Sequence, residues 1–261
     1  MEKILVVCSN AFNDEQRVTL KVVGKVLKDK KIKAVFCERQ QLSVANFLDC
    51  SLVIALGGDG TFLRASHFIR DNTPLLGVNT DVENKEGFYM GCSRYDFEKK
   101  LSFFQGGKYT IRKLQRLEAS INKKKTEELA LNEYYIGSNK GYIASRYMLK
   151  VNSVKERQKS SGIIFATPTG LNAWAKAIGV NYSIDGNQFV YAVREAYEGK
   201  LLGSYKLKSG VLDKNSEIKI RTEINGSILI ADSVGREYPV NYGDHISIRI
   251  SDKFLSAVDF P

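Results

Sequence analysis

The sequence predicts an α/β domain with a parallel sheet, followed by a β-rich, sandwich-like domain. Apolar strand patterns alternate with amphipathic helix patterns up to residue 105, which is typical of a parallel sheet covered on both faces by helices. From residue 109 onward the apolar segments are separated by turn residues such as Asn225-Gly226, which indicates antiparallel strands. The pattern changes at Gly106-Gly107, so the predicted domains are residues 1–106 and residues 107–261.

Each predicted element follows from its local pattern. In the first domain, Asn13 or Asp14 caps a helix that has Val18, Val22 and Val26 on one face. The strands are predicted at 4–8, 32–36, 52–56 and 74–78, and the helices at 14–29, 43–48, 61–70 and 96–105. In the second domain, a helix is predicted at 171–178 and strands at 111–121, 129–136, 147–151, 163–166, 188–193, 218–221, 228–231 and 245–250. The apolar tail at 254–260 is predicted to pack back on the first domain.

Composition and charge narrow the class of partner. The 261 residues are 43% hydrophobic and 26% charged, as in a globular domain, and no apolar run is long enough to span a bilayer. The chain begins directly in a strand pattern, so we expect a cytoplasmic protein. The net charge is +10, but the basic residues are scattered and the run at 123–125 is predicted to be a hairpin tip. We therefore expect a polyanionic small molecule and neither a nucleic acid nor a membrane.

Cysteine and histidine chemistry is not expected. Cysteines stand at positions 8, 37, 50 and 92 without metal-ligand spacing, which favours reduced, buried thiols. The two histidines, His67 and His245, are predicted on a helix and in a turn. The prediction is therefore that the protein itself provides no metal site.

The most informative segment is a glycine turn after a buried strand. Residues 52–56 form an apolar strand, Gly57-Gly58-Asp59-Gly60-Thr61 turns the chain, and a helix follows. Such a turn brings backbone N–H groups close to phosphate oxygens at the carboxyl end of a sheet. No Gly-Lys-Ser/Thr and no Gly-x-Gly-x-x-Gly pattern is present. A carboxylate beside phosphates needs a chemical role, and accepting a proton is one.

Two further polar motifs lie in the second domain. Leu131-Asn132-Glu133 is predicted at a strand, where an amide beside a carboxylate supplies donors and acceptors. Thr167-Pro168-Thr169-Gly170 follows the strand at 162–166 and precedes the helix that carries Trp174, so we expect the positive N-terminal end of that helix to face the same region. Each motif alone has an ordinary structural interpretation, and Trp174 fits either a core or a ligand pocket.

Taken in this order, the three motifs resemble the NAD kinase family. Lipid kinases of the same superfamily, which phosphorylate diacylglycerol and sphingosine, share only the first motif. The resemblance implies a flavodoxin- or Rossmann-like first domain and a β-rich second domain. It also implies ATP-dependent transfer of a phosphoryl group to the 2′-hydroxyl of the adenosine ribose of NAD or NADH. Mg²⁺ bound to ATP and a homodimer follow as further expectations.

The resemblance also implies roles for individual residues. Asp59 is the implied catalytic base, and Phe88, after Gly87, is implied to contact the adenine. Arg64 and Lys159 are candidates for contacts with the triphosphate. The complete set of implied substrate- and nucleotide-binding residues is Gly57, Gly58, Gly60, Thr61, Arg64, Phe88, Tyr89, Asn132, Glu133, Lys159, Ser161, Thr167, Thr169, Gly170, Asn172, Ala173 and Trp174.

Departures from the usual family pattern point to one branch. Ser161 stands where an aspartate is common, Leu171-Asn172-Ala173-Trp174 replaces Ser/Thr-Thr-Ala-Tyr, and the loop after Asn79 is longer than usual. Lys159-Ser160-Ser161-Gly162 and Ala173-Trp174 are similar to the mitochondrial-type branch. The departures leave open the choice between NAD and NADH. They also leave two alternatives to this enzyme: a nucleotide-binding sensor that has lost catalysis, and a lipid kinase of the same superfamily.

Overall fold

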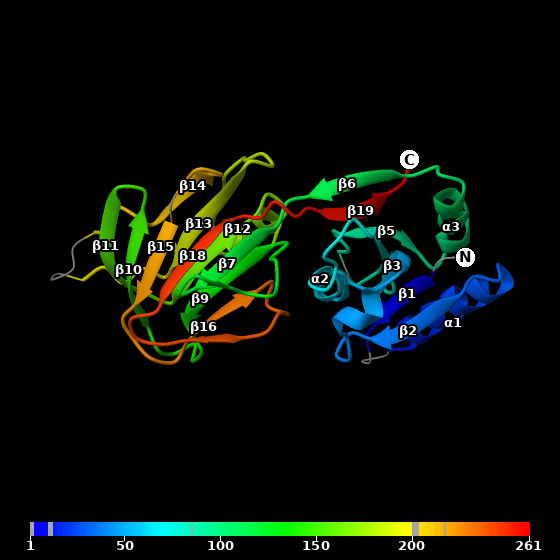
Figure 1. Ribbon diagram of the computed structural model, residues 1–261, viewed down its shortest axis with the longest axis horizontal. Coiled ribbons are helices and arrows are strands. Elements are labelled where there is room, and N and C mark those ends of the chain that lie inside the picture. The colour runs from blue at the N-terminus through cyan, green and yellow to red at the C-terminus, as the bar shows by residue number, and fades with distance from the viewer. Residues whose placement is uncertain (1–2, 10–12, 85, 200–203, 217) are drawn as a thin grey trace. The chain divides into compact units, whose positions relative to one another are not determined.

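The computed structural model describes residues 3–9, 13–84, 86–199, 204–216 and 218–261. The chain forms two compact units, which are labelled by element in Figure 1. Unit 1 contains the chain up to Leu114 together with Phe254–Pro261, and unit 2 contains Gln115–Lys253. Within the described residues, no helix is both long enough and apolar enough to cross a membrane.

Unit 1 is an α/β domain built on a mostly parallel sheet. Its described strands have the order β2-β1-β3-β4-β19-β6, and β5 also pairs with β4. All pairs are parallel except β19 with β6. The bounds of the elements are β1 Lys3–Cys8, α1 Asp14–Asp29, β2 Ala34–Glu38, η1 Val44–Phe47, β3 Cys50–Gly57, α2 Asp59–Ser66, β4 Leu75–Asn79, β5 Met90–Ser93, α3 Phe97–Gln105, β6 Thr110–Leu114 and β19 Leu255–Asp259.

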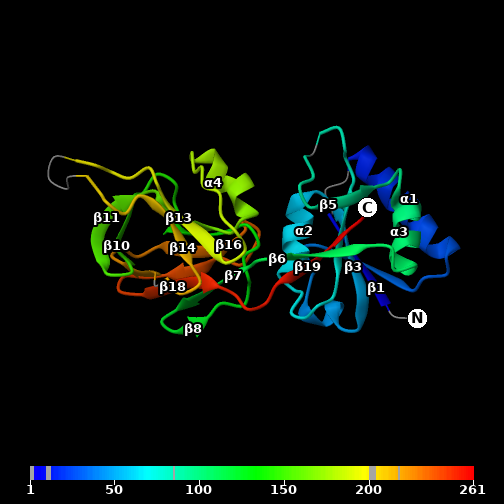
Figure 2. The same cartoon turned by 90° about the horizontal axis from the view of Figure 1, so that it is seen from above.

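Helices cover both faces of this sheet. Val23 and Val26 of α1 and Leu101 of α3 pack in one cluster with Val6 and Ile54 of the central strands. The alternate strand residues are buried as well, and α2 lies on the opposite side of the sheet from α1 and α3, as Figure 2 shows. This is the doubly wound arrangement that the repeated strand–helix pattern predicts.

Unit 2 is a sandwich of two antiparallel sheets. The described strands of one sheet have the order β11-β10-β15-β18-β7-β8, and those of the other have the order β14-β13-β12-β9-β16-β17. The bounds are β7 Leu117–Ile121, β8 Lys124–Lys125, β9 Glu133–Ser138, β10 Ser145–Val151, β11 Val154–Ser160, β12 Gly162–Ala166, η2 Gly170–Asn172, α4 Trp174–Ala177, β13 Gln188–Arg194, β14 Ser209–Asp213, β15 Ile218–Thr222, β16 Ser227–Ala231, β17 Tyr238–Val240 and β18 His245–Ile250.

The core of unit 2 lies between the two sheets. Leu149 and Ile220 of the first sheet meet Ile136, Phe165 and other residues of the second in one buried cluster. A smaller cluster, which includes Tyr135, Ile164 and Ala175, lies where α4 packs on the other face of the second sheet. The β-rich, sandwich-like interpretation of the sequence is therefore confirmed.

Three local predictions differ from the structure. The strand expected at 111–121 is two strands, because β6 pairs with β19 in unit 1 and β7 pairs with β18 in unit 2. The chain thus leaves unit 1 after Leu114, eight residues beyond Gly106. The helix expected at 171–178 is a 3₁₀ turn and a single α-helical turn, because the backbone of Ala173 (φ −104°, ψ −127°) is not helical. Five strands, β5, β8, β11, β14 and β17, were not expected from the sequence.

Candidate active site

The glycine turn of unit 1 joins β3 to α2. Gly58 is the N-cap of α2, and its carbonyl oxygen accepts hydrogen bonds from the Thr61 N–H at 2.9 Å and the Phe62 N–H at 3.3 Å. A Cβ on Gly57 would lie 2.3 Å from Thr61 Oγ1, so only glycine fits there without a shift of Thr61. The turn therefore begins the helix within two residues of the end of the strand.

Asp59 is the first residue of α2, and its carboxylate is held by a loop that follows β4. The Phe88 N–H donates to Asp59 Oδ2 at 3.1 Å, and the Tyr89 N–H donates to Oδ1 at 2.9 Å. Each oxygen is thus oriented by one backbone amide and keeps acceptor capacity for another donor. The carboxylate that the sequence singles out is fixed in direction rather than free to rotate.

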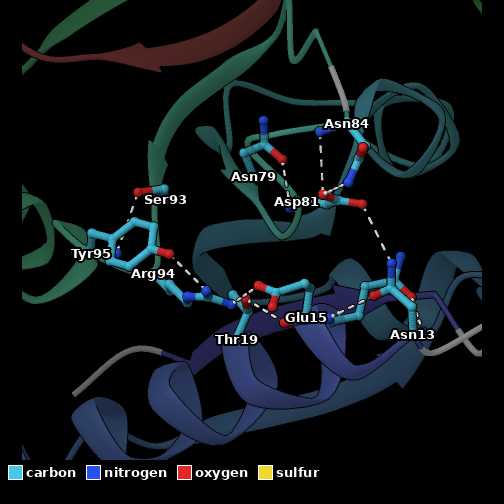
Figure 3. A network of polar contacts seen from close by, with 10 residues as sticks. Asn13, Glu15, Thr19, Asn79, Asp81, Asn84, Ser93, Arg94 and Tyr95 are labelled. Carbon is cyan, nitrogen blue, oxygen red and sulfur yellow. Dashed lines mark hydrogen bonds and ion pairs between the residues drawn. The ribbon is translucent and has the colours of Figure 1, made fainter.

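The loop that supplies these amides is itself anchored at its start. The Thr80 N–H donates to the carbonyl oxygen of Gly57 at 3.1 Å. The Asp81 carboxylate accepts hydrogen bonds from Asn84 Nδ2 at 2.9 Å and from Asn13 Nδ2 at 3.4 Å. Asn13 is the N-cap of α1, so the loop is tied both to the glycine turn and to a neighbouring helix. Figure 3 shows the contacts of Asp81 with Asn84 and Asn13.

A second contact in the same network holds the end of β5 against α1. Arg94 forms an ion pair with Glu15 of α1 and donates to the Tyr95 hydroxyl at 2.7 Å (Figure 3). The backbone before and after the loop is therefore linked to α1. This network anchors the loop that places two amides on Asp59.

The two aromatic residues of the loop have different surroundings. The Phe88 ring is 41% exposed, whereas Tyr89 is 4% exposed. The Tyr89 ring stacks on Phe62 of α2 with ring centroids 4.9 Å apart, and Phe88 meets it edge-on at 5.0 Å. Phe88 is thus available to a ligand, while the ring of Tyr89 packs on α2.

Two arginines lie near the glycine turn, and the sequence indicated one of them. Arg64 stands in α2 with its guanidinium 4.9 Å from the centre of the Phe68 ring. Arg39, directly after β2, was missed, yet its Nη1 lies 3.6 Å from where a Cβ on Gly60 would be. The sequence could have indicated Arg39, because residues that directly follow parallel strands lie at the same edge of the sheet as the glycine turn.

In unit 2, Asn132 and Glu133 are positioned by Asp232, which the sequence did not single out. The Asp232 carboxylate accepts hydrogen bonds from the N–H groups of Leu131, Asn132 and Glu133 at 2.8, 2.7 and 3.0 Å. Its own N–H donates to the Glu133 carbonyl oxygen at 2.8 Å. The side chains of Asn132 and Glu133 therefore project from a backbone segment that hydrogen bonds to Asp232 hold in place.

The Thr167-Pro168-Thr169-Gly170 turn packs on the same segment. The hydroxyls of Thr167 and Thr169 both donate to the Leu131 carbonyl oxygen, at 2.6 and 2.9 Å. The Thr167 N–H donates to the Asn132 carbonyl oxygen at 2.9 Å. A Cβ on Gly170 would lie 2.0 Å from that oxygen. The two motifs of unit 2 thus form one substructure, although the sequence separates them by more than thirty residues.

Burial gives Glu133 an unusual acid–base state. The residue is 4% exposed, and its Oε2 has no hydrogen-bond partner within the described residues. Burial, together with the nearby Asp232 charge, raises the pKa of Glu133 to about 8. At neutral pH the side chain is therefore mostly a neutral carboxylic acid, which can both donate and accept.

The remaining predicted site residues of unit 2 lie around Trp174. The Ser161 carbonyl oxygen accepts a hydrogen bond from the Tyr135 hydroxyl at 2.8 Å. The Tyr135 ring lies 5.2 Å from the indole of Trp174, and the Arg194 guanidinium lies 4.6 Å from the same indole. Trp174 is half-buried, as is Ala173, whereas Asn172 is exposed.

Lys159 does not join that group. Its Nζ lies 4.2 Å from the centre of the Tyr197 ring. Because α4 is a single turn, it does not present the helix N-terminus that the sequence suggested.

A metal-binding cluster is not found in the described part of the chain. There, no group of three or more His, Cys, Asp or Glu side chains is placed to hold a metal ion.

Comparison with known proteins agrees with the motif order. Residues 6–101 match the family model "ATP-NAD kinase N-terminal domain". The chain is 28% identical over 211 residues to a probable NADH kinase of rice, with 71% of this chain and 65% of the relative covered. It is 29% identical over 268 residues to an NAD kinase of Finegoldia magna, with 95% of this chain and 90% of the relative covered.

A solved structure shows the same fold over the whole chain. An NAD kinase from Archaeoglobus fulgidus, crystallised in complex with ATP, superposes with a TM-score of 0.76 at 22% identity and covers 99% of this chain and 93% of its own. The chain spans just under two thirds of the rice relative and most of the bacterial one. The matched N-terminal domain and the relatives along the rest of the chain make this chain similar to NAD kinases over most of its length, and the solved structure shows that it shares their fold.

Proposed function

We propose that this chain is an NAD kinase, which transfers the γ-phosphoryl group of ATP to the 2′-hydroxyl of the adenosine ribose of NAD or NADH. The observation that carries the proposal is the Asp59 carboxylate, which two backbone amides hold at the start of α2. Its glycine turn lies within the segment that matches the kinase domain. A carboxylate that is oriented in this way can accept the proton of an attacking hydroxyl.

The phosphoryl transfer itself needs positioning and charge neutralisation more than covalent chemistry. Gly57, Gly58, Gly60 and Thr61 would present the turn to phosphate oxygens. Arg39 beside Gly60 would supply positive charge there, and Arg64 and Lys159 remain candidates for the same role. Mg²⁺ bound to the ATP phosphates would neutralise the negative charge that develops on the transferred phosphoryl group.

The dinucleotide would be held by the joined motifs of unit 2. Asn132 and the neutral Glu133 offer donors and acceptors to ribose hydroxyls. Thr167, Thr169 and Gly170 would support them through their contacts with residues 131 and 132. Phe88 would contact the adenine, with Tyr89 holding the loop in place. Ser161, Asn172, Ala173 and Trp174 would line the remainder of the dinucleotide site.

Five finer points belong to the same proposal. Membership of the mitochondrial-type branch rests on Asn79-Thr80-Asp81, Lys159-Ser160-Ser161-Gly162 and Ala173-Trp174. The Mg²⁺ requirement and a homodimer rest on the family resemblance alone, and a cytoplasmic location is proposed from the sequence. Acceptance of NADH is supported by the printed name of the rice relative.

The experiment is an assay of NADP and NADPH formation by the purified chain with ATP and Mg²⁺, with NAD and NADH tested separately. Product from the wild type and its loss in Asp59→Asn would support the proposal. Tight NAD binding without any product from either dinucleotide would replace it with the sensor alternative. Phosphorylation of diacylglycerol or sphingosine in place of NAD would replace it with the lipid kinase alternative.

A further inference from the structure

The first sheet of unit 2 has one apolar and one basic face. Figure 1 shows its strands β11, β10, β15, β18 and β7 in this order. Side chains alternate between the faces of a strand, and one set, such as Leu149, Ile220 and Ile248, is buried in the core of the sandwich. The other set forms the outer face, which we call the basic face. Its described members are Arg146, Met148, Lys150, Lys155, Arg157, Lys159, Lys219, Arg221, His245, Ser247, Arg249, Glu118, Ser120 and Lys125.

The strand register arranges these cations in rows. Lys155, Lys150 and Lys219 are directly paired across three neighbouring strands. The same row continues through Ser247 and Ser120 to Lys125. Neighbouring strands lie about 4.8 Å apart and alternate residues along one strand about 6.8 Å apart, so the cationic side chains are spaced at intervals that a phosphate backbone can follow.

A second row runs beside the first. It contains Arg157, Met148, Arg221 and His245. Arg146, Lys155, Arg157 and Arg221 are exposed. The rows therefore form a continuous positive surface rather than a few isolated charges.

Acidic residues are few among the described members of this surface. Among the described members of the basic face there are nine lysines and arginines and one glutamate. Arg157 pairs with Glu223 at 2.6 Å, next to the face, and Lys125 pairs with Glu118 at 3.2 Å. Arg249 also pairs with Glu118. Much of the net charge of +10 that looked scattered in the sequence is thus gathered on one sheet.

Two open grooves follow this surface. A groove of about 580 Å³ is lined by Ser120, Lys123, Lys219, His245 and Ser247, among others. A second, of about 290 Å³, is lined by residues that include Lys123, Lys125 and Arg249. Lysine, arginine, histidine and serine side chains are all donors to phosphate oxygens. The grooves therefore provide concave surfaces with donors for phosphate groups.

Charge and composition restrict the kind of occupant. A second copy of the same face would bring like charges together, because a two-fold interface pairs a patch with itself. The described members include no Phe, Tyr or Trp for base stacking, which single-stranded nucleic acid favours, and no large exposed apolar side chain that could insert into a membrane. Binding of a rigid duplex through its regularly spaced phosphates requires neither aromatic stacking nor apolar insertion.

We propose that the basic face binds the phosphate backbone of double-stranded nucleic acid without reading its sequence. This inference replaces the expectation that nucleic acid is not a partner, because that expectation rested on the spacing of basic residues along the chain. It does not depend on the proposed kinase activity, since none of the residues tested below belongs to the proposed active site.

The test measures anisotropy of a short fluorescein-labelled DNA duplex of mixed sequence between 50 and 200 mM KCl. With about six phosphate contacts, affinity should fall on the order of 10³-fold over this range. The variant Arg146→Gln/Lys155→Gln/Arg221→Gln should bind more weakly, and its log–log salt slope should be shallower by about 2 to 3. The variant Arg17→Gln/Lys21→Gln/Lys25→Gln removes the same charge from the exposed side of α1 and should keep the wild-type slope.

Several outcomes would overturn the inference. These are the absence of duplex binding at 50 mM salt, equal weakening in the α1 control, and single-stranded DNA binding as tightly as the duplex. Retention on phosphatidylserine vesicles without duplex binding would assign the face to a membrane surface instead. Unchanged circular dichroism and kinase turnover in the triple variant of the basic face establish that a lost contact, rather than unfolding, explains the result.

Discussion

The Tyr89 backbone amide donates a hydrogen bond to Asp59 Oδ1 over 2.9 Å. This contact joins the start of α2 to a loop thirty residues further along the chain. The neighbouring Phe88 amide donates to the other carboxylate oxygen, Oδ2. The carboxylate is thus oriented by backbone groups that no substitution other than proline removes. Orientation of this kind precedes substrate binding, which is what a catalytic base needs.

Asp59→Asn should fold normally and lose most of its turnover. The amide keeps one oxygen for the loop N–H groups but cannot accept a proton at neutral pH, so kcat should fall about 10²- to 10⁴-fold. Steady-state rates with NAD and NADH, together with a thermal melt, would check this. Asp29→Asn at the exposed end of α1 is the matched control, and near-wild-type kcat in Asp59→Asn would refute the role of base.

Arg39→Gln should raise KM for ATP more than KM for NAD. A guanidinium beside the glycine turn can form charge-assisted hydrogen bonds with the triphosphate, and the loss of such a contact costs about 1.5–3 kcal/mol, or roughly 10- to 100-fold. Arg112→Gln, which removes an exposed charge from β6 of the same unit, serves as the control. Equal increases in both KM values, or none, would mean that Arg39 does not meet the nucleotide phosphates.

Gly170→Ala should destabilise unit 2 and impair dinucleotide binding together. The added methyl group would lie 2.0 Å from the Asn132 carbonyl oxygen, and overpacking of this kind costs about 1–3 kcal/mol. Urea unfolding and KM for NAD would report the two effects. Gly141→Ala adds the same methyl group where no atom lies within 4 Å and should behave as wild type. A fully stable Gly170→Ala variant with unchanged KM would contradict the close packing of the two motifs.

Glu133 should make stability depend on pH. Because its pKa is raised to about 8 in the folded chain and lies near 4.3 in an unfolded one, the folded state binds the proton more tightly. The stabilisation is fully present below pH 4.3 and is lost as pH rises through 8. The free energy of unfolding of the wild type should therefore decrease over this interval relative to Glu133→Gln, which does not titrate. An exposed Glu237→Gln variant should follow the wild-type curve, and parallel curves for all three proteins would exclude a raised pKa.

The sequence predicted those elements whose local pattern and tertiary setting agree. Strand β3 is a continuous apolar run with a glycine turn after it, and the structure places it at the centre of the sheet. Helix α1 has both a cap at Asn13 and an apolar face. The three motifs could be found for the same reason, since each is a short, unusual sequence at the end of a strand.

The missed features depend on contacts between distant parts of the chain. Asp232 orients Asn132 across a hundred residues, so no local pattern links them. The separation of β6 from β7 depends on a partner, β19, that comes at the end of the sequence. The basic face exists only because the register of six strands places residues from all of them on one side.

The return of β19 into unit 1 has a consequence for the order of folding. This strand lies between β4 and β6, so the sheet of the first unit has a gap until residues 255–259 have been synthesised. Unit 2, whose strands all lie within Gln115–Lys253, can complete its sheets earlier on the ribosome. The unit that is translated first is therefore expected to finish folding last, and a nascent chain lacking its last residues would present the unpaired edge of β6, which is open to aggregation.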